Sequence, residues 1–440
     1  MTWILTRSKL TINIKSYTAV TDHSMAADLE NVRSTLASLS SDIQSLSKDF
    51  VHSPNHPFTP DSELVVKAKQ VIALAQPSQA HILDTAIRCM EAAALRTLSH
   101  LGALQAIPET GSITLEDLAS KTKAQASLLA RLLRALVSTG LLKHSTNHGY
   151  AHTPISAAYA GQSAGMFAML FESGIGPLAL LPDWLEHTYP PSSGNLPSEP
   201  TGIEASTHNP LTYKNRAEGQ TAFDVLAKKP EVAAALQQSL AMSFKANPVV
   251  RFYDYGKLAL PANEKDSGRK VLVDVGGGHG QAVSAILTTH PELATRRDHP
   301  FVLQDREEVL AAITDPLPAA VKTQVHDFFK PQSVKGARAY HIRACLHDWS
   351  DDVCISILSN IVPAMAKDSV LLIAENIVPQ DPGEVSRLTA FMDMGMLVIG
   401  GKERTEADFE ALLQAAGLKI NGIFRAPAPS LHGILECMLA

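Results

Sequence analysis

The chain has 440 residues, 45% of them hydrophobic, and a formal net charge of −6 at pH 7. This length exceeds that of a usual single domain and predicts at least two lobes with sizeable cores. The mild acidity argues against nucleic acid as a partner. The four cysteines are not spaced as in zinc sites or disulfide frameworks, so we expect free thiols, no metal and a cytoplasmic location; they are Cys89, Cys345, Cys354 and Cys437.

The first 24 residues carry basic side chains and no acid before Asp22, but they lack the apolar core of a secretory signal. Two interpretations stay open: an organelle presequence, or an extension of little structural value that precedes a functional start at Met25. Further on, apolar residues recur three and four apart in a heptad seam, Leu29, Val32, Leu36, Leu39, Ile43, Leu46 and Phe50. We interpret this seam as a helix packed against a partner subunit. No segment is long and apolar enough to span a bilayer, so we expect no membrane partner.

A winged-helix pattern follows a Pro/Ser/His-rich linker at 51–61. Residues 64–104 are predicted to be helical, and two short helices and a hairpin follow at 112–120, 125–137 and 140–154. In a DNA-binding protein, residues 124–136 would form the recognition helix, but this segment is largely apolar and we expect it to be buried. We therefore assign residues 25–165 to a helical, winged-helix domain.

The middle of the chain contains a stretch rich in Pro, Gly and Ser, residues 189–202, that has no periodicity. It predicts a mobile surface loop. The helix-rich segment that ends near Pro248 is expected to cover a substrate pocket. We assign residues 166–260 to this loop and these capping helices, and residues 261–440 to a catalytic domain.

The most informative segment is VLVDVGGGHG, residues 271–280. An apolar strand carries Asp274 near its end, and spaced glycines then predict a tight turn that a ligand can approach closely, at Gly276, Gly278 and Gly280. Gln281 stands where a dinucleotide-binding motif has its third glycine, which favours a nucleoside ligand without a pyrophosphate. S-adenosylmethionine is such a ligand.

Two later strands end in candidate ligands for a nucleoside. Residues 301–305 predict a strand whose last residue, Asp305, is placed to accept the ribose hydroxyls. A capping role for Asp305 at the next helix is the alternative. Asp327 and Phe328 follow a further strand, where the acid suits an exocyclic amine and the ring suits a purine face.

A histidine and two acids are candidates for acid–base chemistry. His347 is predicted at the carboxyl end of a strand, just before a helix with Ser350 as its N-cap. Glu375 closes the apolar strand 371–375, and Glu403 precedes a helix at 406–416. A histidine flanked by carboxylates is how a general base is oriented and its charged form stabilised.

Six segments occur in order across residues 210–440: VDVGGGHG, LQD, HDFF, LHDWSDD, AEN and GGKERTEADFEALLQAAG. The set resembles the S-adenosylmethionine-dependent O-methyltransferases of the plant caffeate and flavonoid type, and more closely their fungal relatives that act on phenolic polyketides. The resemblance implies an α/β fold with a Rossmann-like, doubly wound C-terminal sheet and a helical, winged-helix N-terminal dimerisation domain. It also implies a homodimer, S-adenosylmethionine as cofactor, and a phenolic hydroxyl of a small aromatic metabolite as acceptor.

The resemblance also implies residue roles. His347 looks like the general base, and Glu375 and Glu403 look like the acids that hold its imidazole. The cofactor-binding positions match Asp274, Gly276, Gly278, Gly280, Asp305, Asp327, Phe328 and Arg343. The substrate positions match Asp348, Met396 and Met242, of which Met242 is equally consistent with core packing. His279, His326 and Ala344 depart from the pattern of the plant enzymes.

Two other functions remain as alternatives. Some proteins of this fold keep the cofactor but promote dehydration or pericyclic ring formation, and we expect those to lack the histidine base. A catalytically silent, cofactor-binding regulator is the other alternative. The presence of His347, Glu375 and Glu403 together favours methyl transfer over both.

Overall fold

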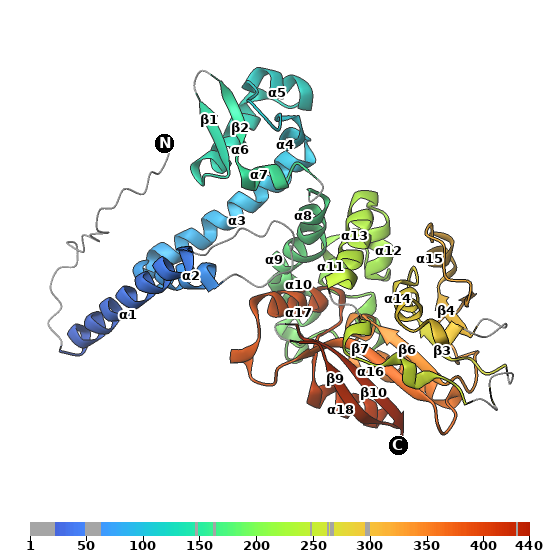
Figure 1. The fold of residues 1–440 in the computed structure, drawn as a ribbon. Helices are drawn as coiled ribbons and strands as arrows, with labels where there is room; N and C mark the ends of the chain where they lie inside the picture. The colour runs from blue at the N-terminus through green and yellow to red at the C-terminus, as the bar shows by residue number, and fades with distance from the viewer. Residues whose placement is uncertain are drawn as a thin grey trace. The chain divides into compact units, whose positions relative to one another are not determined.

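The computed structural model describes residues 23–48, 63–145, 148–161, 164–246, 249–261, 264, 268–294, 300–427 and 430–440. Contacts divide the chain into two compact units, residues 1–87 and 88–440 (Figure 1). Residues 1–22 of the expected N-terminal extension and the linker at 51–61 lie outside the described residues. In the described part no single helix is long and apolar enough to cross a membrane; one bent pair, Ala164–Ala179 with Leu181–Ser193, meets that test by length and composition alone.

The first unit contains α1 (His23–Lys48), α2 (Glu63–Ala75) and the start of α3 (Ser78–His100). The heptad seam lies on α1 as predicted, apart from Phe50, which is outside the described residues. Helix α1 packs against α2, where Lys67 Nζ lies 3.0 Å from Asp42 Oδ2. Leu39 of the seam is 6% exposed. Part of the seam is therefore covered within the same chain.

The start of the second unit has the predicted winged-helix pattern. After α3 come α4 (Ala103–Ala106), α5 (Leu115–Thr122), α6 (Ala126–Ser138), β1 (Leu142–Ser145), β2 (Gly149–His152) and α7 (Pro154–Ala158). The helical stretch predicted for 64–104 is interrupted near Pro77, which cannot continue a helix that precedes it. Leu129, Leu133 and Leu136, on one side of α6, are fully buried, which confirms the expectation that this helix faces a core.

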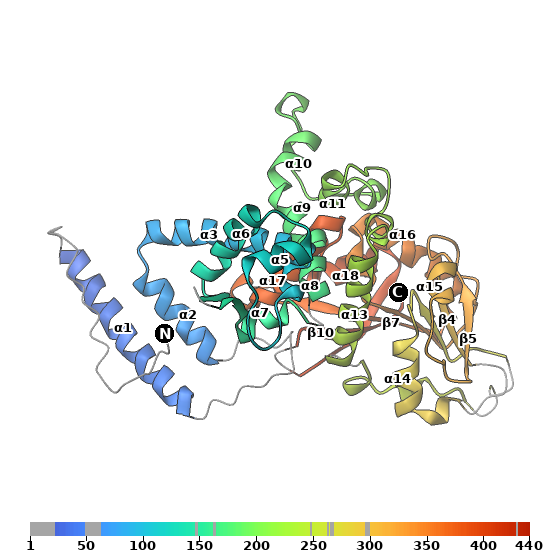
Figure 2. The ribbon, with the colours of Figure 1, turned by 90° about the horizontal axis from the view of Figure 1, so that it is seen from above.

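A second helical layer connects this part to the sheet. It contains α8 (Ala164–Leu170), the π-helix η1 (Phe171–Ile175), α9 (Gly176–Ala179), α10 (Leu181–Thr188), η2 (Pro191–Ser193), η3 (Ile203–Ser206), α11 (Pro210–Lys214), α12 (Ala222–Ala227), α13 (Pro230–Ala246), η4 (Val249–Arg251) and η5 (Tyr255–Leu258). Helices α8 and α13 lie side by side (Figure 2). Glu172 of η1 binds Arg96, Lys214 and Lys229 at 3.2, 3.0 and 2.9 Å, and so joins α3, α11 and the turn that precedes α13.

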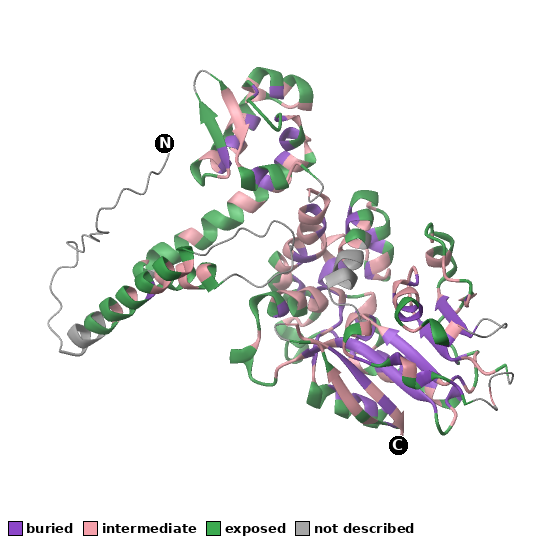
Figure 3. Cartoon of the chain, viewed as in Figure 1, coloured by how far each residue is buried: buried purple, intermediate pink, exposed green. Residues whose placement is uncertain are grey.

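The C-terminal sheet has the strand order β5-β4-β3-β6-β7-β10-β9, with β8 beside β7. Its strands are β3 (Leu272–Val275), β4 (Phe301–Asp305), β5 (Val321–Val325), β6 (Ala339–Arg343), β7 (Val370–Val378), β8 (Arg404–Thr405), β9 (Leu418–Arg425) and β10 (His432–Leu439). Strands β3 to β8 pair in parallel, whereas β10 pairs antiparallel with both β7 and β9. The doubly wound sheet is therefore mixed, and its central strands are buried (Figure 3).

The remaining helices cover the sheet. They are α14 (Gln281–Thr289), η7 (Pro291–Ala294), α15 (Glu307–Ala311), η8 (Leu346–Asp348), α16 (Asp351–Ile361), η9 (Val362–Ala364), η10 (Pro382–Glu384), α17 (Arg387–Ile399) and α18 (Glu406–Ala415). Apolar residues of α14 pack on one face of the sheet, and those of α16 and α18 pack on the other. The strand order reverses at β3, which has β4 on one side and β6 on the other. Ligands of open α/β sheets bind at the carboxyl ends of strands at such a reversal.

Candidate active site

The glycine turn forms directly after β3. Gly276, Gly278 and Gly280 have φ angles of +67°, +59° and +79°, in the left-handed region where a side chain is strained. A Cβ at Gly277 would collide with the Asp274 carboxylate and with Leu303. The turn ends at Gly280, the N-cap of α14. The sequence prediction of a tight turn is confirmed.

Two acids and an aromatic ring were predicted to bind the nucleoside. Asp305 and Phe328 lie close to this turn, whereas Asp327 is exposed. Asp305 Oδ2 accepts a hydrogen bond from the Gly278 amide at 2.8 Å, and the N-cap of α15 is Arg306. Asp305 therefore faces the turn and does not occupy the N-cap position of α15. Burial raises the pKa of Asp305, and backbone hydrogen bonds oppose that shift. A Cβ on Gly276 would lie 3.7 Å from the ring of Phe328, whereas Asp327 is exposed and accepts from the Phe329 amide at 2.9 Å.

His347 lies in η8, directly after β6, and its turn is fixed by backbone contacts. Glu375 Oε1 accepts from the amides of Cys345 and Leu346 at 2.9 and 2.8 Å. Ala344, just before them, has a φ of +46°, an uncommon conformation for a residue with a Cβ. The Lys402 amide donates to the carbonyl of His347 at 2.9 Å. The backbone that carries the imidazole is thus held by two distant segments.

Three carboxylates surround the imidazole of His347. Nδ1 lies 3.1 Å from Glu403 Oε1 and 3.8 Å from Glu375 Oε2, while Nε2 lies 3.7 Å from Asp348 Oδ1. Burial lowers the pKa of His347, but the charges of Glu375, Asp348 and Glu403 outweigh burial and hold it well above its ordinary value. Burial raises the pKa of Asp348 to about 7, since its attraction to His347 only partly compensates. The histidine and acids chosen from the sequence therefore form one cluster.

Glu403 is held from its own side by two further groups. Its amide donates to Asp393 Oδ1 at 2.9 Å, and Asn376 Nδ2 donates to Glu403 Oε1 at 3.2 Å. Burial raises the pKa of Glu403. The charge of His347 and its hydrogen bond lower this pKa by more, so that it lies below its usual range. This carboxylate is therefore anionic at neutral pH, which keeps the Nδ1 hydrogen of His347 directed toward it.

The other predicted positions lie on elements around the cluster. Arg343 ends β6; its burial lowers the pKa of the guanidinium, while Asp274 and Glu375 oppose that shift. Met396 lies on α17, which packs against η8. Met242 lies on α13, but its side chain is outside the described residues. The N-cap position of Ser350 is confirmed, although its hydroxyl donates to the carbonyl of Gly202 and makes no capping bond.

Sequence reasoning missed a group of polar residues on one face of the sheet. His341 Nδ1 lies 2.7 Å from Asp274 Oδ1, and both residues are fully buried. His432 of β10 pairs with Asn376 of β7, and Asn376 in turn donates a hydrogen bond to Glu403. The signal was present at residues 341 and 343: two basic residues, two apart in an otherwise apolar strand, share one face and need buried partners.

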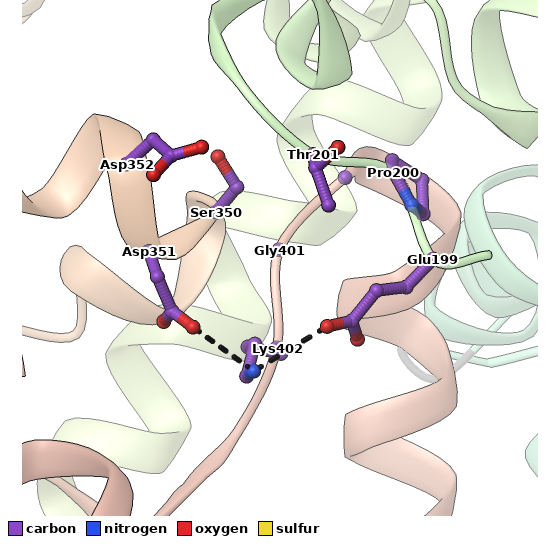
Figure 4. Close-up of a pocket in the computed structure, with 9 residues that line it drawn as sticks. Glu199, Pro200, Thr201, Ser350, Asp351, Asp352, Gly401 and Lys402 are labelled. Atoms are coloured by element: carbon purple, nitrogen blue, oxygen red, sulfur yellow. Dashed lines mark hydrogen bonds and ion pairs between the residues drawn. The ribbon is translucent and has the colours of Figure 1, made fainter. Parts of the chain in front are cut away.

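A small cavity adjoins the backbone that holds His347 (Figure 4). It is lined by Glu199, Pro200, Thr201, Ser350, Asp351, Asp352, Gly400, Gly401 and Lys402. Lys402 Nζ bridges Glu199 Oε1 and Asp351 Oδ2 at 3.5 and 3.2 Å. The C-terminal end of the loop 189–202, predicted from its composition to be mobile, is therefore attached to the catalytic domain.

The geometry fits S-adenosylmethionine. Among the described residues, three buried carboxylate oxygens have no hydrogen-bond partner, and they belong to Asp274, Glu375 and Glu403. Of these, Asp274 Oδ2 lies against the glycine turn, where it is complementary to a cationic ligand that carries hydrogen-bond donors. Glu375 and Glu403 belong to the cluster around His347. Within the same described part, no group of three or more His, Cys, Asp or Glu side chains can hold a metal ion.

The glycine turn and Asp305 lie at the point where the strand order reverses, the ligand-binding place of open α/β sheets. A family model of an O-methyltransferase domain matches residues 204–419, and a model of an O-methyltransferase dimerisation domain matches residues 83–162. The O-methyltransferase kntB of Aspergillus niger is 32% identical over 385 residues, which cover 86% of this chain and 88% of kntB. The chain belongs to the S-adenosylmethionine-dependent O-methyltransferases.

Solved structures agree with this assignment. OxaC, in a complex with sinefungin and meleagrin, superposes with a TM-score of 0.72 at 28% identity, covering 92% of this chain and 99% of OxaC. LepI in complex with S-adenosylmethionine gives a TM-score of 0.67 at 23% identity, covering 93% of this chain and all of LepI, and shows likeness of fold alone. The cofactor of this enzyme is S-adenosylmethionine, as the sequence predicted.

Proposed function

We propose that this methyltransferase acts on a phenolic hydroxyl of a small aromatic secondary metabolite, such as a polyketide or flavonoid-like compound, with His347 as general base. The single observation that supports this proposal best is the orientation of the imidazole. Glu403 engages Nδ1 at 3.1 Å, so the other ring nitrogen of the neutral imidazole carries the lone pair. Nε2 is therefore the atom to receive the phenolic proton.

The proton transfer explains why acids surround the histidine. S-adenosylmethionine, when bound, supplies an electrophilic methyl group on a sulfonium. An ordinary imidazole, with a pKa of about 6.5, is a weak base for a phenol near 10. Glu375, Asp348 and Glu403 raise the pKa of His347 and so bring it closer to the pKa of the phenol. His347 Nε2 takes the proton as the phenol oxygen attacks, and Glu403 stabilises the resulting imidazolium.

The remaining roles are proposals of the same kind. Asp274, Gly276, Gly278 and Gly280 line the methionine and ribose side of the cofactor, Asp305 binds the ribose, Asp327 and Phe328 contact the adenine, and Arg343 lies nearby. Asp348, Met396 and Met242 contact the acceptor. For the cofactor residues and Asp348, the support is their position at or just after the carboxyl ends of β3 to β6. For Met396, the support is its position on the helix that packs against η8, whereas Met242 rests on the sequence alone. We also propose the domain boundaries given above and a cytoplasmic location.

The experiment that tests this function is mass spectrometry of products from a panel of phenolic polyketides and flavonoids, incubated with S-adenosylmethionine. The His347→Ala variant is compared with wild type and with His148→Ala, a matched control at an exposed position. We expect one added methyl group with wild type and His148→Ala, and none with His347→Ala, which should still bind S-adenosylhomocysteine. Methylation by His347→Ala at the wild-type rate would remove His347 from the base role. Water loss or an unchanged mass in a converted product would support the non-methylating alternative.

We further propose that the enzyme is a homodimer. Besides the dimerisation-domain match, α3 has an exposed apolar stripe in which Ile82, Leu83 and Met90 are 71%, 61% and 60% exposed. Large apolar side chains that gather on one face of a helix indicate an interaction surface. Light scattering should give a dimeric mass for wild type and a lower mass for a Leu83→Glu/Met90→Glu variant. A wild-type monomer would contradict the proposal.

A further inference from the structure

A buried histidine and a buried carboxylate pair beneath the glycine turn. Asp274 of β3 and His341 of β6 are direct partners in the parallel register, and each is fully buried. His341 Nδ1 lies 2.7 Å from Asp274 Oδ1, a short hydrogen bond in which the ring nitrogen donates to the carboxylate. Asp274 belongs to the cofactor motif, whereas no step described above uses His341.

The imidazole is also held on its other side. Tyr255 is fully buried and its ring lies nearly perpendicular to that of His341, with centroids 6.2 Å apart. The Tyr255 hydroxyl is 3.5 Å from His341 Nε2, at the limit of a hydrogen bond. The strong contact of the ring is therefore the one to Asp274, and the tyrosine mainly restricts how the ring is packed.

The second oxygen of Asp274 points to the ligand side. Among the described residues, Oδ2 has no hydrogen-bond partner although it is buried. A Cβ on Gly277 would collide with this oxygen, so it lies directly against the glycine turn. A buried carboxylate oxygen without a donor is unfavourable, and a donor brought by the ligand would satisfy it.

The cofactor has one group that suits this oxygen better than its others. The ribose hydroxyls already have a candidate acceptor in Asp305, which lies on the next strand and contacts Gly278. The α-ammonium group of the amino-acid end is a cation with three donors, so it pairs best with a carboxylate in a buried place. We propose that His341 is a positioning residue, which holds Asp274 so that its Oδ2 accepts the α-ammonium group of S-adenosylmethionine.

The proposal is tested by binding without any acceptor, so it does not depend on the proposed phenolic substrate. Isothermal titration calorimetry would compare S-adenosylhomocysteine with 5′-methylthioadenosine, which keeps the adenosine but lacks the amino-acid end. In His341→Leu, which leaves Asp274 unsupported, we expect S-adenosylhomocysteine to bind about tenfold more weakly or worse, as for loss of a charge-assisted hydrogen bond. Binding of 5′-methylthioadenosine should stay at the wild-type level.

Two polar variants keep the test independent of a general loss of stability. The amide of His341→Asn reaches the position of Nδ1 and should restore binding of S-adenosylhomocysteine, whereas the amide of His341→Gln reaches the position of Nε2 and should not. Tyr255→Phe is the matched control for a change in the same buried cluster and should bind both ligands normally. Unchanged affinity for S-adenosylhomocysteine in the Leu and Gln variants, or equal weakening of both ligands, would overturn the proposal.

Discussion

The substitution Glu403→Gln tests how the cluster around His347 works. It removes a negative charge 3.1 Å from Nδ1 but keeps the length of the side chain and an amide oxygen that can accept the same hydrogen bond. The backbone contact of residue 403 with Asp393 is unaffected by the change. A loss of activity would therefore report the charge of the carboxylate more than its shape.

The expected magnitude follows from the distances. An opposite charge within about 4–6 Å shifts a pKa by roughly 1–3 units, and Glu375, at 3.8 Å, remains in the variant. We therefore expect the pKa of His347 to fall and the imidazolium to lose about 1.5–3 kcal/mol of stabilisation, the contribution of a hydrogen bond to a charged group. The imidazolium forms in the transition state, so kcat should fall about 10–100-fold.

The pH dependence gives the test its direction. The carboxylates raise the pKa of His347, so the neutral base predominates only above that raised pKa, and kcat/KM of wild type should rise with pH through it. In Glu403→Gln the rising limb should move to lower pH while the plateau falls. The assay is the initial rate of S-adenosylhomocysteine formation across pH, with Glu406→Gln, an exposed acid three positions on, as control. If the rising limb of the pH profile stays at the wild-type pH while the plateau rate drops, the charge of Glu403 does not set the pKa of His347.

Three other predictions concern stability and positioning. Ala344 has a φ of +46°, a left-handed conformation that is unfavourable for a residue with a Cβ. In urea unfolding, Ala344→Gly should therefore raise the free energy of unfolding by about 1 kcal/mol, and Ala344→Val should lower it. Burial raises the pKa of Glu172, but Lys229 and Lys214 lower it by more, from 4.5 to about 2. Glu172→Gln should therefore lower the free energy of unfolding by about 3 kcal/mol at pH 7. In acid unfolding, this difference from wild type should shrink as the pH falls from 4.5 toward 2. A Cβ on Gly401 would collide with the carbonyl of His347, so Gly401→Ala should lower kcat with little change in S-adenosylhomocysteine affinity, whereas Gly395→Ala, which meets nothing within 4 Å, should not.

Patterns that depend on neighbours along the chain predicted much of this fold. The apolar periodicity of residues 125–137 was sufficient to place Leu129, Leu133 and Leu136 in a core, because helix geometry fixes which residues share a face. The glycine spacing after β3 predicted the turn, since backbone at positive φ excludes most side chains. Asp305 ends β4 as predicted. Glu375 was expected to close its strand, but it lies inside β7, which continues to Val378 because its last residues pair with β10 and β8. It still lies level with the end of β6, since its neighbour Ala374 pairs with Arg343.

Contacts between side chains on neighbouring strands could not be predicted from the sequence, for a physical reason. The bond between Asp274 and His341 depends on the register of β3 against β6, which no local pattern specifies. The same holds for Glu375: its position predicted an acid beside the histidine, but one of its oxygens binds the amides of Cys345 and Leu346. The π-helix at 171–175 likewise has no sequence signature of its own.

The position of His347 depends on contacts that hold its backbone as well as on the partners of its imidazole. Glu375 fixes the amides that precede His347, and the segment 400–403 supplies both the close packing at Gly401 and the carboxylate on Nδ1. Lys402, in the same segment, ties Glu199 and Asp351 together (Figure 4). One short stretch therefore couples the loop 189–202 to the imidazole, because any shift of residues 400–403 moves Glu403 and the His347 carbonyl contact together. Substitutions in that stretch should alter the rate of methyl transfer even where they touch neither cofactor nor acceptor.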